Sequence, residues 1–435
     1  MVVLLYPLVM QTKQRITTGK GLMNFMLGKH DLSLKERTLQ FNAFLTELKR
    51  DEHYSYQRVC LSPMDREVMI LDSFTRRAKP MLMFASNNYL GLGNHPYVKK
   101  AVQDIVNTYG VGVGGPPLLN GYSLLMQSLE EKIAAFKGKE AAIIFPAGFM
   151  TNLGAISALA NRNDVVIHDQ LSHASLHAAL QLTEAENIRF PHNNTAKMEQ
   201  LIVERKPNYT TVFAAMEGVY SMDGDLAPLD EMIPVCQKHG AFVLLDDAHG
   251  IGVLGKNGRG SAELLGVEDG IDLYVGTFSK AFSVTGGYLV GNRDLIEYLR
   301  YFARSYVFSA ALPPMTLAAV SAGIDVIQNE PERRAKLLDN AAYAACKLQD
   351  FGLSIPPAGA ILALRTPRWM NIRAANRKLH ELGIFINAIE YPAVSVNKQR
   401  FRASISANHT YADIDRLADC FAQVWNDPDC RKAGY

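Results

Sequence analysis

The chain has 435 residues, 48% of them hydrophobic, and its 45 Lys and Arg residues nearly balance its 43 Asp and Glu residues. The net charge of +2 and the lack of a long basic run argue against a nucleic-acid partner and favour a small-molecule ligand. This length exceeds the size at which one hydrophobic core stops growing, so we expect a large domain and a smaller one.

The first 75 residues are polar and helical in pattern, without the rhythm of a strand, and they are predicted to form an N-terminal arm. Within them, residues 1–10 are apolar except for Tyr6 and Pro7. This segment lacks a basic leader and a small-residue cleavage site, and it is too short to span a bilayer. Two alternatives stay open for it: packing against its own domain, or peripheral contact with a membrane or a partner.

From residue 141 onward, short apolar runs alternate with amphipathic segments, which is the pattern of βαβ units and a mostly parallel sheet. The clearest helix is predicted over residues 123–137, with Ser123 as its N-cap and Gly138 as its stop. The predicted strands span residues 141–145, 164–167, 211–216, 241–245, 273–276 and 287–290.

Pro313 and Pro314 follow this block and mark a breakpoint, since proline lacks an amide donor and disfavours helix before it. Beyond them, helical patterns precede two strand-like pieces near residues 361–365 and 402–406. We therefore expect three parts: an arm (1–75), a large domain (76–315) and a smaller C-terminal α/β domain (316–435).

The cysteines are scattered, and no Cys-x-x-Cys spacing for zinc or redox exchange occurs among them. Such usage favours a reducing cytoplasm. His173 and His177 are four residues apart, but they lack the His-Glu-x-x-His pattern, so no metal site is predicted. The five cysteines are Cys60, Cys236, Cys346, Cys420 and Cys430.

Lys280 lies just beyond the apolar run 273–276, and Asp246 directly follows the run 241–245. Both therefore belong to the carboxyl edge of the sheet, where open α/β proteins bind ligands. Pyridoxal 5'-phosphate needs a lysine amine for its aldehyde carbon and a carboxylate for its ring nitrogen. Lys280 and Asp246 supply that pair, although either charge alone would be ordinary at a strand end.

Other segments add groups that suit the same cofactor. Gly148 follows a strand and opens a helix whose free amides can cradle a phosphate, and Thr277 and Ser279 offer hydroxyls to it. For Gly148 a turn without ligand is the alternative. His173 follows another strand and can stack on a flat ring or serve as a structural hydrogen-bonding group.

The glycine-rich run at 110–115 is not a dinucleotide fingerprint, because its spacing is wrong and it does not join a strand to a helix. A nicotinamide dehydrogenase is thus disfavoured. The run is interpreted as a loop that closely approaches a ligand or a second subunit.

Taken in order, these motifs resemble the α-oxoamine synthases, pyridoxal-phosphate enzymes that join an amino acid to an acyl thioester with loss of carbon dioxide. The resemblance runs from about residue 83 to residue 406. It implies the α/β fold of fold type I pyridoxal-phosphate transferases, with a mostly parallel seven-stranded sheet and a smaller C-terminal α/β domain. It also implies a homodimer with active sites at the subunit interface.

The resemblance assigns roles to the residues of each matching motif. In Asp246-Asp247-Ala248-His249 it implies Asp246 on the pyridine nitrogen and His249 on the phenolic oxygen, and in Thr277-Phe278-Ser279-Lys280 it implies Lys280 as the Schiff-base lysine. His173 matches the ring-stacking histidine, which completes a catalytic set of Lys280, His173, Asp246 and His249. The other implied cofactor contacts are Gly148, Phe149, Ser221, Thr277 and, toward the neighbouring subunit, Ser309.

Three further residues are implied to contact substrate. Asn87 and Asn88 lie in the segment Ser86-Asn87-Asn88-Tyr89-Leu90-Gly91, which seats the substrate in the family. Arg402 matches the arginine that holds the amino-acid carboxylate, a task that suits the two-pronged guanidinium group. In the implied reaction an amino acid displaces Lys280 from the cofactor, and the freed amine then removes the Cα proton.

The motifs of two branches of the family are mixed in this chain. Residues 216–221 and 306–314 are most similar to bacterial serine palmitoyltransferases, whereas residues 249–255 are closer to 8-amino-7-oxononanoate synthases. Many members carry Gly-Ser-Arg where this chain has Gly115-Pro116-Pro117. Because that segment faces substrate in the family, an unusual acyl donor or carrier is expected.

We therefore expect an acyltransferase that condenses serine with an acyl thioester of coenzyme A or a carrier protein, as in sphingolipid biosynthesis. Alanine or glycine as the amino acid is the alternative. Another pyridoxal-phosphate reaction, such as aldol cleavage or amino transfer, and a non-catalytic partner subunit are the rival classes. The rivals differ from the main hypothesis in whether an acyl thioester is consumed with release of carbon dioxide.

Overall fold

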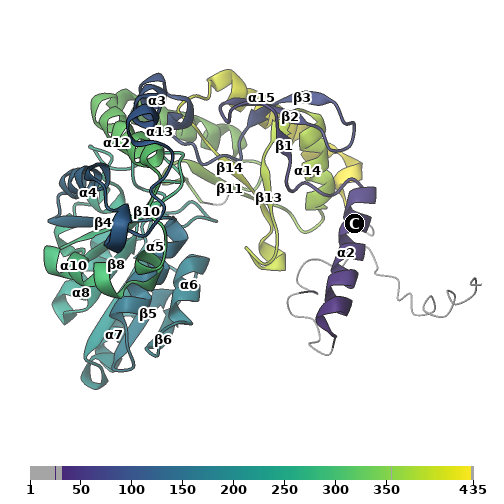
Figure 1. Ribbon diagram of the computed structural model, residues 1–435. Helices are drawn as coiled ribbons and strands as arrows, with labels where there is room; N and C mark the ends of the chain where they lie inside the picture. The colour runs from purple at the N-terminus through teal and green to yellow at the C-terminus, as the bar shows by residue number, and fades with distance from the viewer. Residues whose placement is uncertain (1–24, 26–31, 354, 433–435) are drawn as a thin grey trace, which may run out of the picture.

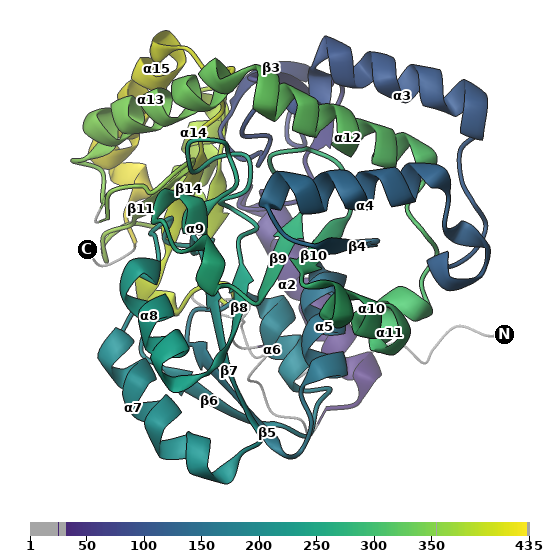
Figure 2. The same ribbon diagram turned by 90° about the vertical axis from the view of Figure 1, so that its left-hand side faces the viewer.

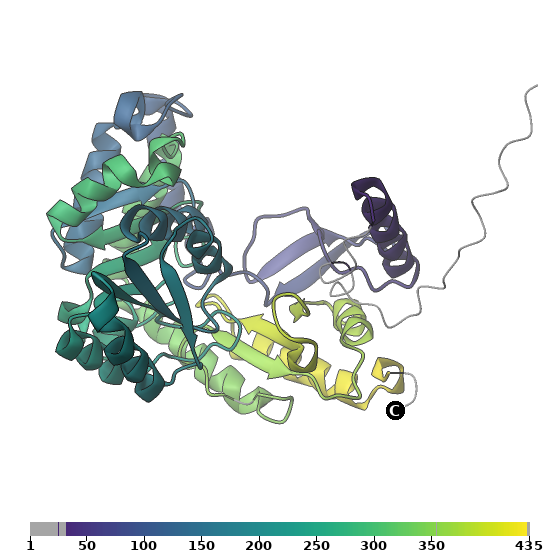
Figure 3. The same cartoon turned by 90° about the horizontal axis from the view of Figure 1, so that it is seen from below.

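The computed structural model of the chain describes residue 25, residues 32–353 and residues 355–432. The apolar segment 1–10 lies outside the described residues, so its contact with a membrane stays a prediction. The described chain forms a larger and a smaller lobe, with helix α2 (Leu34–Arg50) beside the smaller one (Figures 1 and 3). In the part of the chain that the structure describes, no helix is both long and apolar enough to cross a bilayer.

The larger lobe is built on a seven-stranded sheet in the order β4-β10-β9-β8-β7-β5-β6. β10 runs antiparallel to its neighbours β4 and β9, and every other pair is parallel. The predicted mostly parallel seven-stranded sheet is confirmed. Its strands are β4 (Ala141–Phe145), β5 (Asp164–Asp169), β6 (Glu186–Phe190), β7 (Thr211–Glu217), β8 (Phe242–Asp246), β9 (Leu273–Thr277) and β10 (Gly287–Gly291).

The strand that sequence analysis did not find is β6, at the edge of this sheet. Its side chains alternate between half-buried and exposed positions, and only Phe190 is fully buried. The six strands found from sequence instead bury nearly all of their side chains and appear as continuous apolar runs. An edge strand with one solvent-exposed face does not form a continuous apolar run in the sequence.

Helices cover both faces of the sheet, with α4 and α12 on one side and α5 on the other (Figure 2). Helix α4 begins after Ser123, whose Oγ accepts a hydrogen bond from the Met126 amide at 3.3 Å, and ends at Gly138 in the left-handed conformation, as predicted. The helices of this lobe are α3 (Pro96–Tyr109), α4 (Leu124–Lys137), α5 (Gly148–Leu159), α6 (Ala174–Leu180), α7 (Thr195–Arg205), α8 (Leu229–His239), α9 (Ser261–Leu264), α10 (Arg293–Phe302), α11 (Arg304–Val307) and α12 (Pro314–Asn329).

Pro313 and Pro314 do not simply interrupt the chain. Pro313 is the N-cap of α12 and Pro314 its first residue, a position where the missing amide has no helical partner to lose. The helix they begin packs against α3 and α4 of the larger lobe. The division of the chain at residues 75 and 315 stays a prediction.

A second sheet joins the beginning of the described chain to the smaller lobe, in the order β1-β2-β3-β12. The expectation of no strands before residue 75 was wrong. Strand β2 buries Val68 and Ile70, but Met69 and Leu71 on its other face are also apolar, so the polar alternation that identifies a strand is absent. The strands are β1 (Val59–Cys60), β2 (Glu67–Leu71), β3 (Ala78–Met83) and β12 (Ile384–Phe385).

The smaller lobe also contains an antiparallel sheet in the order β11-β14-β13. The strands predicted near 361–365 and 402–406 correspond to β11 (Ile361–Arg365) and β14 (Arg400–Ser404). Strand β14 carries Arg402 toward the larger lobe, where its guanidinium group meets the loop after β7. The remaining elements are β13 (Asn387–Ile389), α13 (Pro331–Leu348), α14 (Ile372–Glu381) and α15 (Tyr411–Asn426).

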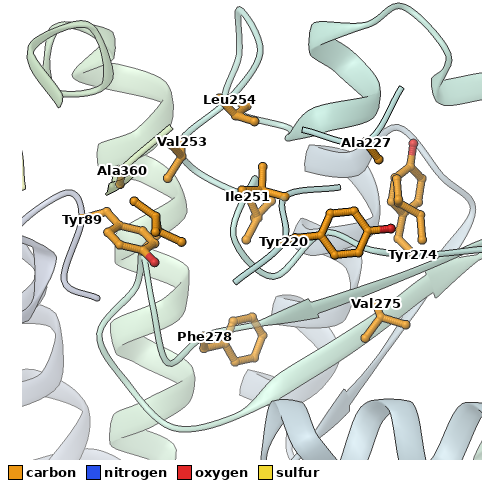
Figure 4. Close-up of a cluster of buried hydrophobic side chains, with 14 of the residues drawn as sticks. Tyr89, Tyr220, Ala227, Ile251, Val253, Leu254, Tyr274, Val275, Phe278 and Ala360 are labelled. Atoms are coloured by element: carbon orange, nitrogen blue, oxygen red, sulfur yellow. The ribbon is translucent and has the colours of Figure 1, made fainter. Parts of the chain in front are cut away.

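The carboxyl edge of the large sheet is held by buried apolar side chains from several loops. Figure 4 shows Val253 of the loop after β8 near Tyr89, with Ile251 of the same loop to the right of them and Phe278, beyond β9, below. All four side chains are at most 1% exposed. Such packing fixes the carboxyl ends of β8 and β9, next to which Asp246 and Lys280 lie.

Candidate active site

A cavity of about 310 Å³ lies at the carboxyl ends of β7, β8 and β9, beside the start of α5. It brings together eight of the residues predicted from sequence: Gly148, Phe149, His173, Asp246, His249, Thr277, Ser279 and Lys280. The same cavity is lined by Asn152, Ser175, Glu217, Thr285 and Gly286, among others. Among the described residues, no cluster of His, Cys, Asp and Glu side chains suits a metal ion, and all five cysteines are free.

Lys280 is half-buried in the wall of the cavity. Loss of hydration lowers its pKa to about 8, although the negative charge of Asp246 acts in the opposite direction. The amine is therefore partly neutral near physiological pH. A neutral amine is the form that can attack a carbonyl carbon or accept a proton.

This pKa leads to a testable expectation for the cofactor-free protein. Acylation of Lys280 by an amine-directed reagent should rise with pH along a curve with its midpoint near 8, rather than near the ordinary lysine value of 10.5. In Asp246→Asn the midpoint should fall further, because the Asp246 carboxylate favours the protonated amine. Peptide mass spectrometry after timed labelling measures both curves, and an unshifted midpoint in the parent protein would contradict the described burial.

Asp246 is the last residue of β8 and is held in place by hydrogen bonds. Its Oδ2 accepts a hydrogen bond from Asn152 Nδ2 at 2.6 Å, and its Oδ1 accepts one from the Ala248 amide at 3.1 Å. Asn152 also donates to Ser175 Oγ at 2.9 Å, which ties α5 to α6 behind the carboxylate. A fixed carboxylate of this kind can pair with a protonated ring nitrogen.

Glu217 was quoted in a motif by sequence analysis but given no role. It ends β7 and pairs in register with Asp246 on the neighbouring strand, so the two carboxyl groups share one edge of the sheet. Burial and the nearby Asp246 charge raise the pKa of Glu217 well above its ordinary value, which favours the protonated form of this group. The signal for Glu217 was present in the sequence: like Asp246, it follows an apolar strand.

Two polar atoms at the cavity are buried without a hydrogen-bond partner, Glu217 Oε1 and Asn152 Oδ1. Unpaired buried polar atoms are costly, so their presence in a cavity wall indicates a polar ligand. Both lie on the side of the cavity that carries Asp246.

The opposite end of the cavity suits a phosphate. A Cβ atom added to Gly148 would lie 2.6 Å from Thr277 Oγ1, so only glycine allows this approach of α5 to β9. The Thr277 hydroxyl lies 2.8 Å from Ser279 Oγ, and the first amides of α5 have no helical partner. Hydroxyls and amides at a helix N-terminus bind anions.

His173 is the N-cap of α6 and faces the cavity. Its Nδ1 accepts a hydrogen bond from the Ser175 amide at 3.2 Å and lies 2.7 Å from Ser175 Oγ. These contacts fix the plane of the imidazole ring. Because Ser175 is also bonded to Asn152, the ring and the Asp246 carboxylate are oriented by one network.

His249 is buried behind the cavity, and burial together with the charges of Lys280 and Arg402 lowers its pKa well below the ordinary value. Its Nδ1 lies 2.8 Å from the Tyr89 hydroxyl, which is also 3.1 Å from Asn87 Oδ1 and 3.5 Å from Arg402 Nη2. Tyr89 thus links the cofactor side of the cavity to the residues predicted for substrate. Sequence analysis gave Tyr89 no role.

The other predicted site residues do not line the cavity. Arg402 is buried, donating from Nε to the Ser221 carbonyl at 2.7 Å and from Nη1 to Asn87 Oδ1 at 3.1 Å. Asn88 Oδ1 accepts a hydrogen bond from Ser283 Oγ at 2.6 Å, and the Ser309 hydroxyl points at Met150 Sδ, 4.0 Å away. The roles predicted for these five residues, Ser221 included, and for the residues that line the cavity stay predictions.

Comparison with known proteins decides the family. The family described as aminotransferase class I and II matches residues 79–421. The chain is 37% identical over 400 residues to the 8-amino-7-oxononanoate synthase of Thermoanaerobacter pseudethanolicus, covering 91% of this chain and 97% of the relative. The chain belongs to the α-oxoamine synthases.

The solved serine palmitoyltransferase of Sphingomonas wittichii has the same fold, with a TM-score of 0.85 and 32% sequence identity over 90% of this chain and 98% of that one. The 4-hydroxy-2,2'-bipyrrole-5-methanol synthase PigH of Serratia is 35% identical over 90% of this chain, which spans 60% of that relative. These α-oxoamine synthase relatives carry different product names, so family membership does not decide the substrate.

The α-oxoamine synthases depend on pyridoxal 5'-phosphate, and solved serine palmitoyltransferases contain it. The cavity of this α-oxoamine synthase fits that group, with an amine, a carboxylate, a phosphate cradle and two unpaired polar atoms in its wall. Lys280 would hold its aldehyde carbon, Asp246 its ring nitrogen, and Gly148 with Thr277 its phosphate. The predicted cofactor is thus confirmed at the level of the family.

Proposed function

We propose that this enzyme condenses an amino acid, serine in the first place, with an acyl thioester and releases carbon dioxide to give an α-amino ketone. The observation that carries the proposal is the joint presence of Lys280, Asp246 and His173 around one cavity. A non-catalytic partner subunit would have no need to keep the three together. Decarboxylative condensation is the reaction of the α-oxoamine synthases as a class.

In the proposed reaction each residue has a separate task. The bound cofactor supplies an electron sink for the negative charge that develops at Cα. The Lys280 amine accepts the Cα proton and later returns one, the Asp246 carboxylate keeps the ring nitrogen protonated, and His173 covers one face of the ring. Arg402 binds the amino-acid carboxylate, for which its buried guanidinium group has the right charge and shape.

Serine is supported by the likeness to serine palmitoyltransferase structures, which would place the product in sphingolipid synthesis. Alanine or glycine is the second candidate, because several relatives at 33–39% identity are named 8-amino-7-oxononanoate synthases. We propose that the acyl donor is a thioester of either coenzyme A or a carrier protein. In this chain the segment after Pro116 forms a single turn, Pro117–Gly121, that exposes Leu119.

A homodimer is part of the proposal. Large apolar side chains are exposed around the cavity and on the helices next to it, with Phe308 83%, Leu119 81% and Phe149 46% exposed. Exposed apolar surface of this kind is typical of a face that another subunit covers. Ser309, directly after Phe308, would then reach the cavity of the neighbouring subunit.

We also propose a cytoplasmic location, because the five cysteines are free.

The proposal is tested in two steps with the cofactor-loaded protein. First, serine, alanine and glycine are titrated separately while the visible absorbance of the cofactor is followed, and the preferred amino acid should change the spectrum at the lowest concentration. Second, acyl thioesters of several chain lengths, on coenzyme A and on a carrier protein, are added. One carbon dioxide and one free thiol per amino ketone are expected.

Each rival reaction gives a distinct result. Aldol cleavage would release an aldehyde from serine without any thioester, and amino transfer would consume a keto acid. Spectral change with an amino acid but no consumption of any thioester would overturn the condensation while leaving a pyridoxal-phosphate enzyme.

A further inference from the structure

His192 lies outside the cavity, between two carboxylates from different parts of the chain. Its Nδ1 is 3.1 Å from both oxygens of Asp169, the last residue of β5, and its Nε2 is 2.7 Å from Asp225 Oδ2. The side chain of Asp169 is fully buried, and those of His192 and Asp225 are 21% and 12% exposed. The imidazolium form donates from both ring nitrogens, so a protonated His192 between the two carboxylates satisfies all three groups.

One end of this bridge supports the loop that carries His173. Asp169 Oδ1 accepts a hydrogen bond from the Leu171 amide at 2.8 Å, and the Asp169 carbonyl accepts one from the Ser172 amide at 3.1 Å. His173, which faces the cavity, is the next residue. The position of this turn therefore depends on the Asp169 carboxylate.

The other end supports the loop that meets Arg402. The Tyr220 amide donates to the Asp225 carbonyl at 3.0 Å, and the Tyr220 ring packs edge-on against His192, with centroids 4.4 Å apart. Ser221, the next residue, accepts the 2.7 Å hydrogen bond from Arg402 Nε. Asn193 adds a second link, donating to Asp225 Oδ2 at 2.9 Å and, from its amide, to Asp169 Oδ2 at 2.8 Å.

We propose that the His192 imidazolium is a positioning residue that clamps the loop 218–225 to the end of β5 and thereby sets Arg402 for the amino-acid carboxylate. His192 touches neither the cavity lining nor Arg402 itself. The proposal rests on the proposed function for the role of Arg402, and it adds a residue to which no role in catalysis or binding is otherwise assigned.

The charge state of the clamp is set by the groups around the ring. These are Asp169 from β5, Asp225 from the loop after β7, and the Tyr220 hydroxyl, which is buried and has no hydrogen-bond partner among the described residues. Burial lowers the pKa of His192, but hydrogen bonds and charge interactions with the two carboxylates outweigh it and raise the pKa to about 9. Since the folded-state pKa is raised, the clamp is complete at neutral pH and opens as the pH rises through about 9.

The test uses His192→Gln in the cofactor-loaded protein. The dissociation constant of the preferred amino acid, from absorbance titration, should rise about tenfold, as expected when a substrate-binding side chain loses its positioning. The KM of the acyl thioester and the occupancy of the cofactor should not change. Combined with Arg402→Lys, the loss should be smaller than the product of the two single losses, because both variants impair one contact.

His239→Gln is the matched control. His239 also contacts a carboxylate, Glu199 at 2.9 Å, and its side chain is 19% exposed, but it joins α8 to α7 far from the cavity. Amino-acid affinity should stay at the parent value in this variant. Equal losses in both histidine variants, or a parallel loss of cofactor from His192→Gln, would show that His192 only supports the fold and would overturn the proposal.

Two measurements do not depend on a functional assay or on a foldable His192 variant. The His192 ring signals in the NMR spectrum of the parent should titrate near pH 9, and Asp225→Asn should shift that midpoint downward while speeding amide exchange in residues 219–226. A ring that is neutral at pH 7 would overturn the clamp even if amino acids bind. Conversely, a parent that binds no amino acid but shows the expected titration would contradict the proposed function and leave the clamp in place.

Discussion

Replacing Lys280 by alanine should abolish the covalent bond between the chain and its cofactor and reduce turnover by at least about 10⁴-fold, the upper range for loss of a positioned acid-base group. No other lysine lines the cavity, so nothing on the described chain can substitute for this amine. After borohydride reduction, the intact mass of the parent should include the cofactor, and that of the variant should not. Turnover is measured as amino ketone formed per enzyme.

Lys256→Ala is the matched control for this substitution. Lys256 is exposed in the loop between β8 and β9 and does not line the cavity. Its variant should bind cofactor and turn over like the parent. Near-normal turnover in Lys280→Ala would exclude Lys280 as the base.

Replacing Asp246 by asparagine should leave some cofactor bound but lower the rate by about 10³-fold, which is the scale of losing one preorganised electrostatic contact. Asparagine keeps the shape of the side chain, but its single amide oxygen can accept only one of the two hydrogen bonds that Asn152 and the Ala248 amide donate to different Asp246 oxygens. It has no charge to keep a ring nitrogen protonated, and an unprotonated ring is a poor electron sink. The loss should therefore affect kcat, with little change in amino-acid affinity.

The same substitution at the opposite end of the sheet is the control. Asp272 lies just before β9 and accepts a hydrogen bond from the Val243 amide at 2.7 Å, which asparagine can also accept. Asp272→Asn should keep the parent rate. A near-normal rate in Asp246→Asn would show that Asp246 does not protonate the ring nitrogen. Another residue could hardly replace it, because Glu217 is the only other carboxyl group in the cavity lining and burial favours its protonated form.

Burial explains why these two residues act together. Water around a lysine and a carboxylate would weaken their interaction, whereas the enclosed cavity strengthens it and at the same time lowers the pKa of the amine. In the proposed reaction, the lowered pKa makes part of the Lys280 amine neutral, while the Asp246 carboxylate would pair with the ring nitrogen. The protonated Glu217 limits the negative charge at this edge to that of Asp246.

The catalytic side of the site was predictable because each residue follows a strand that is itself easy to find. Asp246 and Lys280 come at the ends of fully apolar runs, and β8 and β9 are adjacent in the sheet. The residues expected around the cofactor could therefore be predicted from one rule, that the carboxyl ends of parallel strands lie at the same edge of a sheet. Arg402, which we propose to bind substrate, belongs to β14 of the other lobe, and its distance from the cavity depends on how the lobes pack.

The element types of the large sheet, the placement of Lys280 and Asp246 at one edge of that sheet and the resemblance to the family could all be predicted from the amino-acid sequence, because these depend on local periodicity and on motifs within short stretches. Tertiary structure alone decided the edge strand β6, the protonated Glu217 and the bridge through His192. The reason is that a charge state or a clamp depends on neighbours contributed by other strands: Asp169 and Asp225 meet His192 from positions 23 and 33 residues away. No local pattern reports the distance between such groups.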